Sequence, residues 1–574
     1  MGSVTRREFL GSAGVTAAGV GALSARQAAA APRTREDRER RPNFIMIMTD
    51  DQGYGDLGCH GNPHLRTPNI DKLHAESVRF TNFYVTPVCA PTRAGLLTGR
   101  DHYRTGVVDT YMGRAMMDPS EVTIAEALRA AGYRSGIFGK WHLGDNYPLR
   151  PHERGFDESL VHRGGGIAQP HEPIMTGYFN PILQQNGVER QYEGYCTDVF
   201  TDAAIDFIER QQDQPFFVYL PTNAPHVPLI IHDRYAQPYR DMGLDEETAR
   251  TYGMIENIDE NVGRLLEKLD ELGLAEDTFV MFLTDNGAHF DEEGDRFTAN
   301  LRGRKGTIYE GGIRVPCFVR WPRKLPAAVD VPQVAAHIDL FPTMMGICGQ
   351  PLPEDRTIDG RDLTPLMTSG GEPDEWPDRN IFLQWHRGDA PEPFRASAVR
   401  GPRYKLINGE ELYDLHEDPG EEHDIAAQHP DIVADLRQAY EEWFEDVTAS
   451  RGFHPVRIYV GSGHERPTLL TSQDWRGADT WYNVRAAYWE LHVERAGRYN
   501  VSLLTLDRRS TGRARITIGG QVHEKDFPEW NPKWTFTGVE LPEGDTRLSF
   551  EILEYQQGDM GVEGARFAEV ARMG

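Results

Sequence analysis

Two apolar runs of the sequence each end in side chains that carry oxygen donors. Asp50 and Asp51 close the first run, and Asp285 and Asn286 close another run far along the chain. Adjacent carboxylates repel each other unless a cation lies between them, so the pattern favours a hard divalent metal. Three carboxylates and an amide suit Ca²⁺ or Mg²⁺ rather than zinc. Taken alone, Asp50-Asp51 would more often be a solvated acidic turn.

A second group of side chains could bind and process an anion. Cys89 opens the segment C-A-P-T-R-A-G-L-L-T-G-R, which contains Arg93, and the sequence G-K-W-H contains Lys140 and His142. A cysteine in an apolar stretch is most often a small buried hydrophobe. Isolated lysines and histidines are more often solvated or satisfied in a core, so these residues gain meaning only from the pattern around them.

The elements that must position these residues follow a repeating helix-then-strand order. Short apolar runs at residues 44–48, 135–138, 215–220 and 279–283 predict buried strands of a parallel sheet. Helical patterns over residues 120–131, 198–210 and 254–272 precede the last three. The sequence therefore predicts an α/β sheet with helices on both faces, and ligands bind at the carboxyl ends of strands in such sheets.

The pattern changes twice in the second half of the chain. Residues 351–450 contain short strands near 403–407 and 411–415 and a helix over 431–444, which predicts a smaller α+β subdomain. Residues 451–574 carry alternating or apolar runs separated by Gly-rich turns, which predicts a β-sandwich. The catalytic α/β domain is accordingly expected over residues 42–350.

The amino-terminal 31 residues resemble a twin-arginine export signal. Arg6-Arg7 precede Phe9-Leu10, a weak apolar run over residues 11–23, and small residues at 28–30 that suit a signal peptidase. The run is too short and too rich in Gly and Ala for a membrane anchor. After a charged linker at 32–41, the mature protein is expected in the periplasm or outside the cell, with the twin-arginine export machinery as a partner.

Length, charge and cysteine content exclude several classes of protein. A chain of 574 residues is too long for one compact core. Its 61 Lys and Arg against 88 Asp and Glu give a net charge of −27, which argues against a general nucleic-acid binder. Five cysteines without a C-x-x-C pair make a zinc module or a disulfide scaffold a poor interpretation. No other segment predicts a stable membrane span.

The segment that begins at Cys89 resembles the first signature of the sulfatases, C-x-P-[S/T]-R-x-x-x-[L/I]-x-T-G, at every fixed position. The sequence G-Y-R-S leading to G-K-W-H at residues 132–142 resembles the second. Further similarities are the opening at residues 43–58, Ala224-Pro225-His226, Thr284 to Gly287, and Lys305-Gly306. The resemblance covers residues 42–450 and leaves the last 120 or so outside.

The resemblance implies an alkaline-phosphatase-like α/β fold and hydrolysis of sulfate esters. In this family the signature cysteine is oxidised by a maturation enzyme to formylglycine, whose hydrated gem-diol is the nucleophile. Carried onto this sequence, Cys89 is that residue. Asp50, Asp51, Asp285 and Asn286 would hold one Ca²⁺ (Mg²⁺ fits the family less well) together with an oxygen of the modified Cys89. Arg93, Lys140 and Lys305 would bind the diol and the sulfate, while His142 and His226 would transfer protons.

Three functional hypotheses remain open at this point. The first is an exported sulfatase acting on an aryl sulfate or a sulfated carbohydrate. The second is a phosphodiester or phosphonate monoester hydrolase of the same superfamily, because phosphoryl groups need similar clamps. The third is an inactive glycan-binding relative.

The β-sandwich itself has two interpretations. Trp475, Trp481, Trp489, Trp530 and Trp534 could stack on sugars, as in carbohydrate-binding modules, or form an aromatic core.

Overall fold

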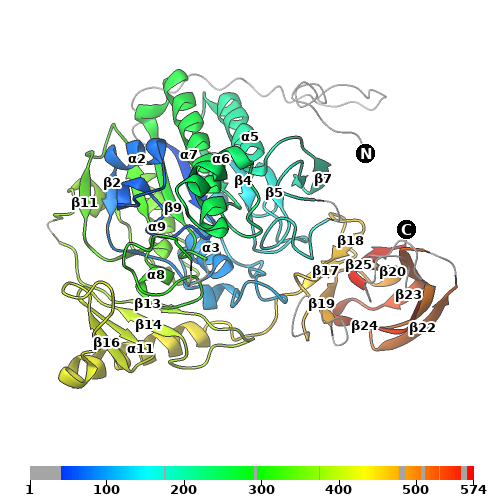
Figure 1. Ribbon diagram of the computed structural model, residues 1–574. Helices are drawn as coiled ribbons and strands as arrows, with labels where there is room; N and C mark the ends of the chain where they lie inside the picture. The colour runs from blue at the N-terminus through cyan, green and yellow to red at the C-terminus, as the bar shows by residue number, and fades with distance from the viewer. Residues whose placement is uncertain are drawn as a thin grey trace.

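The computed structural model describes residues 41–173, 176–289, 294–373, 375–477, 487–505, 511–528, 531–556 and 565–573. The predicted leader and all but the last residue of the predicted linker lie outside this range. A large α/β body carries a smaller sheet below it and an all-β module at its side, coloured orange to red (Figure 1). The α/β architecture expected from the sequence is confirmed.

The α/β body is built on a mixed ten-stranded sheet. Its strand order is β11 (Val329–Val331), β2 (Val78–Phe80), β10 (Cys317–Arg320), β9 (Thr278–Thr284), β1 (Asn43–Thr49), β8 (Phe216–Pro221), β4 (Arg134–Lys140), β5 (Glu158–His162), β6 (Ile182–Gln185) and β7 (Val188–Gln191). The five strands from β9 to β5 are parallel, and β10, β6 and β7 pair antiparallel. The four strands predicted from apolar runs are β1, β4, β8 and β9.

Helices cover both faces of this sheet, and the side chains of β1 alternate between them. Ile45 and Ile47 pack with helices α5 (Cys196–Gln211) and α7 (Glu246–Glu271). Phe44, Met46 and Met48 pack with α3 (Cys89–Thr98), α4 (Ile124–Ala130) and α9 (Leu340–Ile347). Because both faces are covered, residues 44–48 of the strand are all apolar, which explains the unbroken hydrophobic run.

Helix boundaries differ from the sequence-based expectation where capping residues decide them. The helix expected from Ser120 begins only at Ile124, because Thr123 and Glu126 form a capping box. The helix expected from Met254 begins earlier, at Glu246, where the side chain of Asp245 accepts a hydrogen bond from the amide of Thr248.

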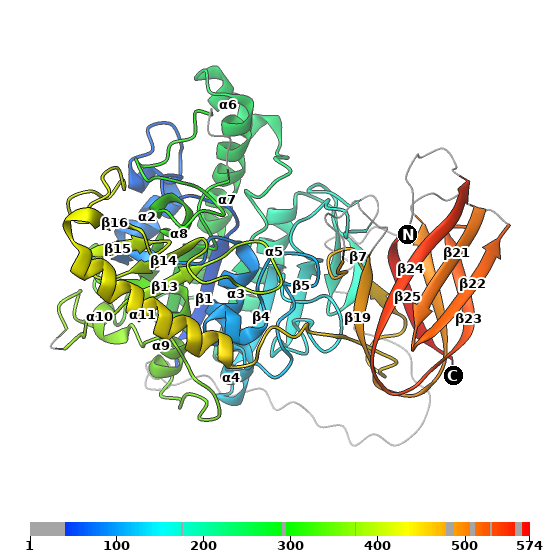
Figure 2. The same cartoon turned by 90° about the horizontal axis from the view of Figure 1, so that it is seen from below.

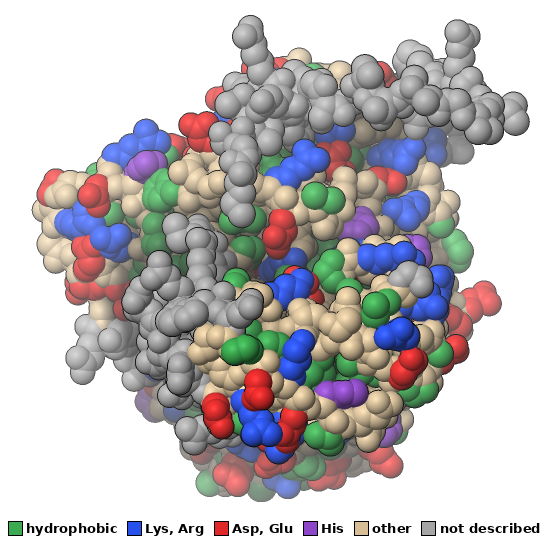
Figure 3. Space-filling view, turned by 90° about the vertical axis from the view of Figure 1, so that its right-hand side faces the viewer, with side chains coloured by type: hydrophobic (Ala, Val, Ile, Leu, Met, Phe, Trp, Pro, Cys, Tyr) green, Lys and Arg blue, Asp and Glu red, His purple; other side chains and the backbone are tan. Residues whose placement is uncertain are grey.

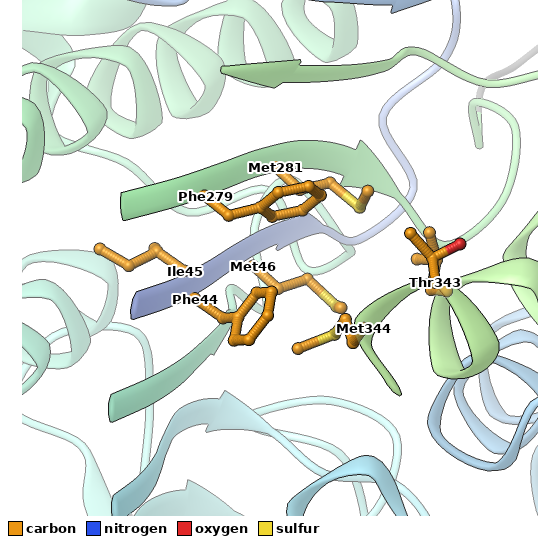
Figure 4. Close-up of a pocket in the computed structure, with 8 residues that line it drawn as sticks. Phe44, Ile45, Met46, Phe279, Met281, Thr343 and Met344 are labelled. Atoms are coloured by element: carbon orange, nitrogen blue, oxygen red, sulfur yellow. The ribbon is translucent and has the colours of Figure 1, made fainter. Parts of the chain in front are cut away.

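The core under β1 is closely packed. A void of about 10 Å³ lies between β1, β9 and α9 and is lined by apolar atoms of residues such as Phe44, Met46, Met281 and Met344 (Figure 4). A space of this size and polarity is too small and too apolar to hold a water molecule or a ligand. We therefore interpret it as a packing defect.

A four-stranded antiparallel sheet and a long helix follow the α/β body. The sheet runs in the order β13 (Ile381–Gln384), β14 (Ser397–Arg400), β15 (Tyr404–Ile407) and β16 (Glu411–Asp414). Helix α11 (Pro430–Ala449) packs against it through Leu436 and Tyr440. Figure 2 shows this helix along the lower side of the body. The α+β pattern expected here is present.

The strands of the carboxyl-terminal module span residues 458–572. They form two packed sheets in which most neighbouring strands are antiparallel. One sheet contains β17 (Ile458–Val460), β19 (Tyr488–Val493), β24 (Gly544–Gln556), β21 (Thr511–Ile518) and β22 (Gln521–Phe527); the other contains β18 (Thr468–Leu470), β25 (Ala565–Arg572), β20 (Gly497–Thr505) and β23 (Lys533–Leu541). Its core also takes in Met112, Met116 and Leu149 of the α/β body. The module is thus a β-sandwich that packs directly on the body.

The tryptophans of this module favour one of the two interpretations left open by the sequence. Trp475, Trp489 and Trp534 have no exposed surface, so they form the aromatic core and cannot stack on a glycan. Trp481 and Trp530 lie outside the described residues.

The surface carries no single-sign patch on the face seen in Figure 3, where acidic and basic side chains are interspersed. Among the described residues, every helix is too short or too polar to cross a bilayer.

Candidate active site

The parallel pairing of β1, β9, β8 and β4 brings the predicted site residues to one edge of the sheet. Thr49 at the end of β1 lies opposite Thr284 at the end of β9. The residues that follow, Asp50 and Asp285, are therefore neighbours. Lys140 ends β4 on the other side of β8. All candidate site residues named from the sequence gather around this edge.

The proposed metal ligands form a buried set of oxygen atoms. Asp50, Asp51, Asp285 and Asn286 are at most 1% exposed. Oδ1 of Asp50, Oδ2 of Asp51 and Oδ1 of Asn286 have no hydrogen-bond partner. Burying acceptors without donors costs about 1–3 kcal/mol each, more for charged groups. Unpartnered carboxylate and amide oxygens at one place are what Ca²⁺ or Mg²⁺ requires, so the residues present fit a divalent metal.

Cys89 lies beside these oxygens at the first residue of α3. Ligand atoms of Asp50, Asp51, Cys89 and His226 all lie within 4.8 Å of one another. Cys89 is 2% exposed. Burial raises the pKa of its thiol to about 11, although Lys140 and Lys305 oppose the shift. The thiol is therefore protonated at neutral pH and is a poor nucleophile as it stands.

Two lysines place positive charge against the carboxylates of β1. Nζ of Lys140 lies 2.6 Å from Oδ2 of Asp50, and both side chains are fully buried. Nζ of Lys305 lies 2.5 Å from Oδ1 of Asp51. Burial alone would raise the pKa of Asp51, but Lys305, His226 and Lys140 outweigh it and hold that pKa well below its usual range. Asp51 is thus ionised, as a metal ligand must be.

Arg93 orients Asp285 rather than pointing into open space. Its Nη2 and Nε donate to Oδ2 of Asp285 over 2.7 and 3.1 Å, and its Nη1 donates to the carbonyl of Lys140 over 3.0 Å. The guanidinium is fully buried. Burial and Asp50 raise the pKa of Asp285 to about 6, against the lowering effect of Arg93. Arg93 therefore links the α3 segment to the ends of β9 and β4.

The two candidate histidines have different hydrogen-bond partners. Nε2 of His226 lies 3.7 Å from Oδ2 of Asp51, while its Nδ1 contacts the carbonyl of Val227. Nε2 of His142 contacts the carbonyl of Thr110 over 2.7 Å. Burial lowers the pKa of both rings, that of His226 to about 3 and that of His142 well below 6.5. Both are neutral, so each can accept a proton.

The structure adds residues that the sequence did not single out. Gln473, from the carboxyl-terminal module, donates to the same Thr110 carbonyl that His142 contacts. Trp385 donates its indole N–H to Asp109 and lies against Gly306, next to Lys305. Neither Gln473 nor Trp385 belongs to a segment with a chemical pattern, so no signal in the sequence could have found them.

Comparison with known proteins identifies the family. The family model described as Sulfatase matches residues 42–350, and the model described as N-sulphoglucosamine sulphohydrolase, C-terminal, matches residues 304–446. The N-acetylgalactosamine-6-sulfatase of Canis lupus familiaris is 36% identical over 65% of this chain and 72% of its own. Arylsulfatase A of Homo sapiens is 33% identical over 70% of this chain and 87% of its own.

Solved structures agree with the sequence relatives. The crystal structure of Ps i-CgsB in complex with k-i-k-neocarrahexaose has a TM-score of 0.65 at 29% identity and covers 72% of this chain and 95% of that one. The phosphonate monoester hydrolase of Agrobacterium radiobacter, at 23% identity over 71% of this chain and 96% of that one, shares the fold with a TM-score of 0.50. With a family match over more than half of its length, the chain belongs to the sulfatases and is a sulfuric ester hydrolase.

Proposed function

We propose that this sulfatase hydrolyses sulfate esters through a formylglycine made from Cys89, beside a Ca²⁺ held by Asp50, Asp51, Asp285 and Asn286. One observation supports this above others: Cys89 is buried within 4.8 Å of two carboxylates and a histidine. A maturation enzyme and its oxidant must supply the conversion of thiol to aldehyde.

A protonated thiol does not suit the reaction, whereas a hydrated aldehyde does. The raised pKa of Cys89 leaves little thiolate at neutral pH. The hydrated formylglycine has two hydroxyl groups: one attacks sulfur and displaces the alcohol, and loss of a proton from the other restores the aldehyde as sulfate leaves. We assign the proton transfers to His142 and His226, whose neutral rings can accept a proton.

The remaining residues neutralise the charge of the sulfate. A bound Ca²⁺ would polarise oxygens at this site as a Lewis acid. Lys140 and Lys305 supply ammonium groups next to Asp50 and Asp51, and Arg93 holds Asp285 in position. Fixed charges in a buried site stabilise developing negative charge without reorganisation. An acidic protein with a net charge of −27 thus carries a local cationic pocket.

The alcohol part of the substrate is proposed to be a sugar or an aryl group. Relatives named N-acetylgalactosamine-6-sulfatase and a neighbour solved with a neocarrahexaose support a sulfated carbohydrate. A panel of sulfated monosaccharides and oligosaccharides, compared with an aryl sulfate, tests this assignment. A preference for the aryl sulfate by kcat/KM would remove the carbohydrate proposal.

The chemistry at sulfur is tested with matched substrates. We expect an aryl sulfate to be turned over faster than the aryl phosphonate or phosphodiester with the same leaving group. A strong preference for the phosphorus substrate would favour the phosphonate monoester hydrolase alternative, whose fold this chain shares. No turnover of either, with an intact formylglycine in the peptide mass spectrum, would favour an inactive glycan-binding relative.

Export is proposed from the leader alone. Arg6-Arg7 and the apolar run behind them support passage through the twin-arginine machinery to the periplasm or the medium. Replacing both arginines by lysine should retain the protein in the cytoplasmic fraction. Unchanged export of that variant would contradict the assignment.

A further inference from the structure

A turn of the carboxyl-terminal module reaches the proposed proton-transfer residue His142. This turn, residues 471–476, is mostly buried, and Gln473 is 2% exposed. Nε2 of Gln473 donates to the carbonyl oxygen of Thr110 over 2.8 Å. The same oxygen contacts Nε2 of His142 over 2.7 Å. Residues far apart in the chain therefore meet at one carbonyl beside the site.

The shared carbonyl determines which nitrogen of His142 carries the proton. A carbonyl oxygen only accepts hydrogen bonds, and it has two lone pairs. Both Gln473 and His142 must therefore donate to Thr110, so the 3.4 Å between their two nitrogens separates two donors that share an acceptor. With the proton on Nε2, the buried Nδ1 of His142, which has no hydrogen-bond partner, is left as the basic nitrogen.

The turn and the loop that contains Thr110 are joined by one backbone hydrogen bond and one side-chain hydrogen bond. The amide of Gly113 donates to the carbonyl of Gln473 over 3.0 Å. Nη2 of Arg476 donates to the carbonyl of Gly113 over 2.9 Å. Gly113 has φ +66°, and a Cβ there would lie 2.8 Å from the carbonyl of Asp474. The close fit leaves the Thr110 carbonyl little freedom to move without the module.

His142 needs such support because its own backbone is unfavourable. Its φ is 62°, in the left-handed region that side-chain-bearing residues rarely adopt. A Cβ at Gly165 would lie 2.9 Å from Cε1 and Nε2 of the imidazole ring. Gly165 and the Thr110 carbonyl therefore both confine the Nε2 edge of the ring.

We propose that the β-sandwich module is a structural part of the active site and that Gln473 is a positioning residue for His142. This inference rests on the proposed role of His142 in proton transfer. Gln473 fixes the Thr110 carbonyl, and that carbonyl fixes the tautomer and orientation of the ring. The module thus acts on the reaction itself and is more than an attached binding unit.

The test compares two substitutions at Gln473 with a matched control. Gln473→Ala removes the donor and the volume, and Gln473→Met removes the donor but keeps the volume. Both should lower kcat on an aryl sulfate by about tenfold to a hundredfold, the range seen when a residue that orients a functional group is lost, with KM changed less than about twofold. The pH dependence of kcat should shift in both variants, because the Thr110 carbonyl that fixes the tautomer of His142 loses its second donor and is held less firmly.

The control is Gln521→Ala, which replaces an exposed glutamine of the same module that also donates to a backbone carbonyl. It should leave kcat and the pH profile unchanged. Wild-type kcat in Gln473→Met with loss only in Gln473→Ala would show a packing role and overturn the inference, as would wild-type kcat in both. Failure of the proposed function would differ, because the wild-type enzyme itself would then lack sulfatase turnover.

Discussion

Lys140 and Asp50 form a fully buried ion pair, with 2.6 Å between Nζ and Oδ2. The pair leaves Oδ1 of Asp50 without a hydrogen-bond partner. One carboxylate can thus serve two cations, the lysine through Oδ2 and a metal through Oδ1. In the proposed function, Lys140 would hold this metal ligand and also bind the substrate anion.

Replacing Lys140 by methionine should therefore lower kcat/KM on an aryl sulfate by about 10² to 10³, as removal of one preorganised donor does elsewhere. Steady-state kinetics measures the effect, and thermal unfolding shows how far the uncompensated Asp50 destabilises the fold. Lys72→Met, at a largely exposed lysine of α2 (Pro68–Ala75), is the control and should change neither quantity. Equal activity of Lys140→Met and the wild type would remove Lys140 from the site.

Replacing Cys89 by alanine should abolish turnover, because the proposed nucleophile is made from its side chain. In the wild type, the peptide that contains residue 89 should have a mass matching formylglycine rather than cysteine. Cys348→Ser, at a cysteine whose thiol contacts Tyr133 in the core, should retain kcat. Activity in Cys89→Ala comparable with that of Cys348→Ser would rule out Cys89 as the source of the nucleophile.

Removing divalent metal should lower both activity and stability, because the buried oxygens of Asp50, Asp51 and Asn286 then face one another without a cation. Ca²⁺ at a hundred times its Kd should restore about 2.7 kcal/mol of stability, measured as a rise in Tm. Mg²⁺ should restore less. Asn286→Ala should weaken the response. Asn82→Ala, which removes a side chain that donates to the carbonyl of Pro332, should keep it. A Tm insensitive to chelator and Ca²⁺ would exclude the metal site.

The acid limb of the kcat–pH profile should lie below pH 6.5. Burial and, secondarily, Lys140 lower the pKa of His142 well below that value, so the basic form of the ring persists at pH 6.5. As pH falls through this lowered pKa, the ring gains a proton and can no longer accept one, and kcat drops. The profile of the wild type is compared with that of His142→Gln. An acid limb at or above pH 6.5 that is lost in His142→Gln would contradict the assignment.

The sequence predicted those parts of the site that local patterns encode. Asp50 and Asp285 follow apolar strands, so their meeting followed from the parallel pairing of those strands. Cys89 was found because it opens a segment with several fixed positions. The contact between Gln473 and His142 spans 331 residues and leaves no periodicity or motif. The start of α4 was misplaced because Thr123 and Glu126, rather than hydrophobic spacing, begin that helix. Whether Trp475 and Trp489 stack on sugars or form a core depended on their burial, which the alternating pattern of polar and apolar residues in the sequence does not reveal.

The central place of β1 has a consequence for the order of events during synthesis. This strand leaves the ribosome first, yet its partners β8 and β9 lie about 170 and 235 residues further along the chain. Cys89, buried once α3 packs under that sheet, stays accessible until those partners arrive. At roughly 5–20 residues per second, the delay from Cys89 to the end of β9 lasts on the order of 10 to 40 seconds. Under the proposed function, a maturation enzyme would have that interval to reach Cys89 before the sheet closes over it.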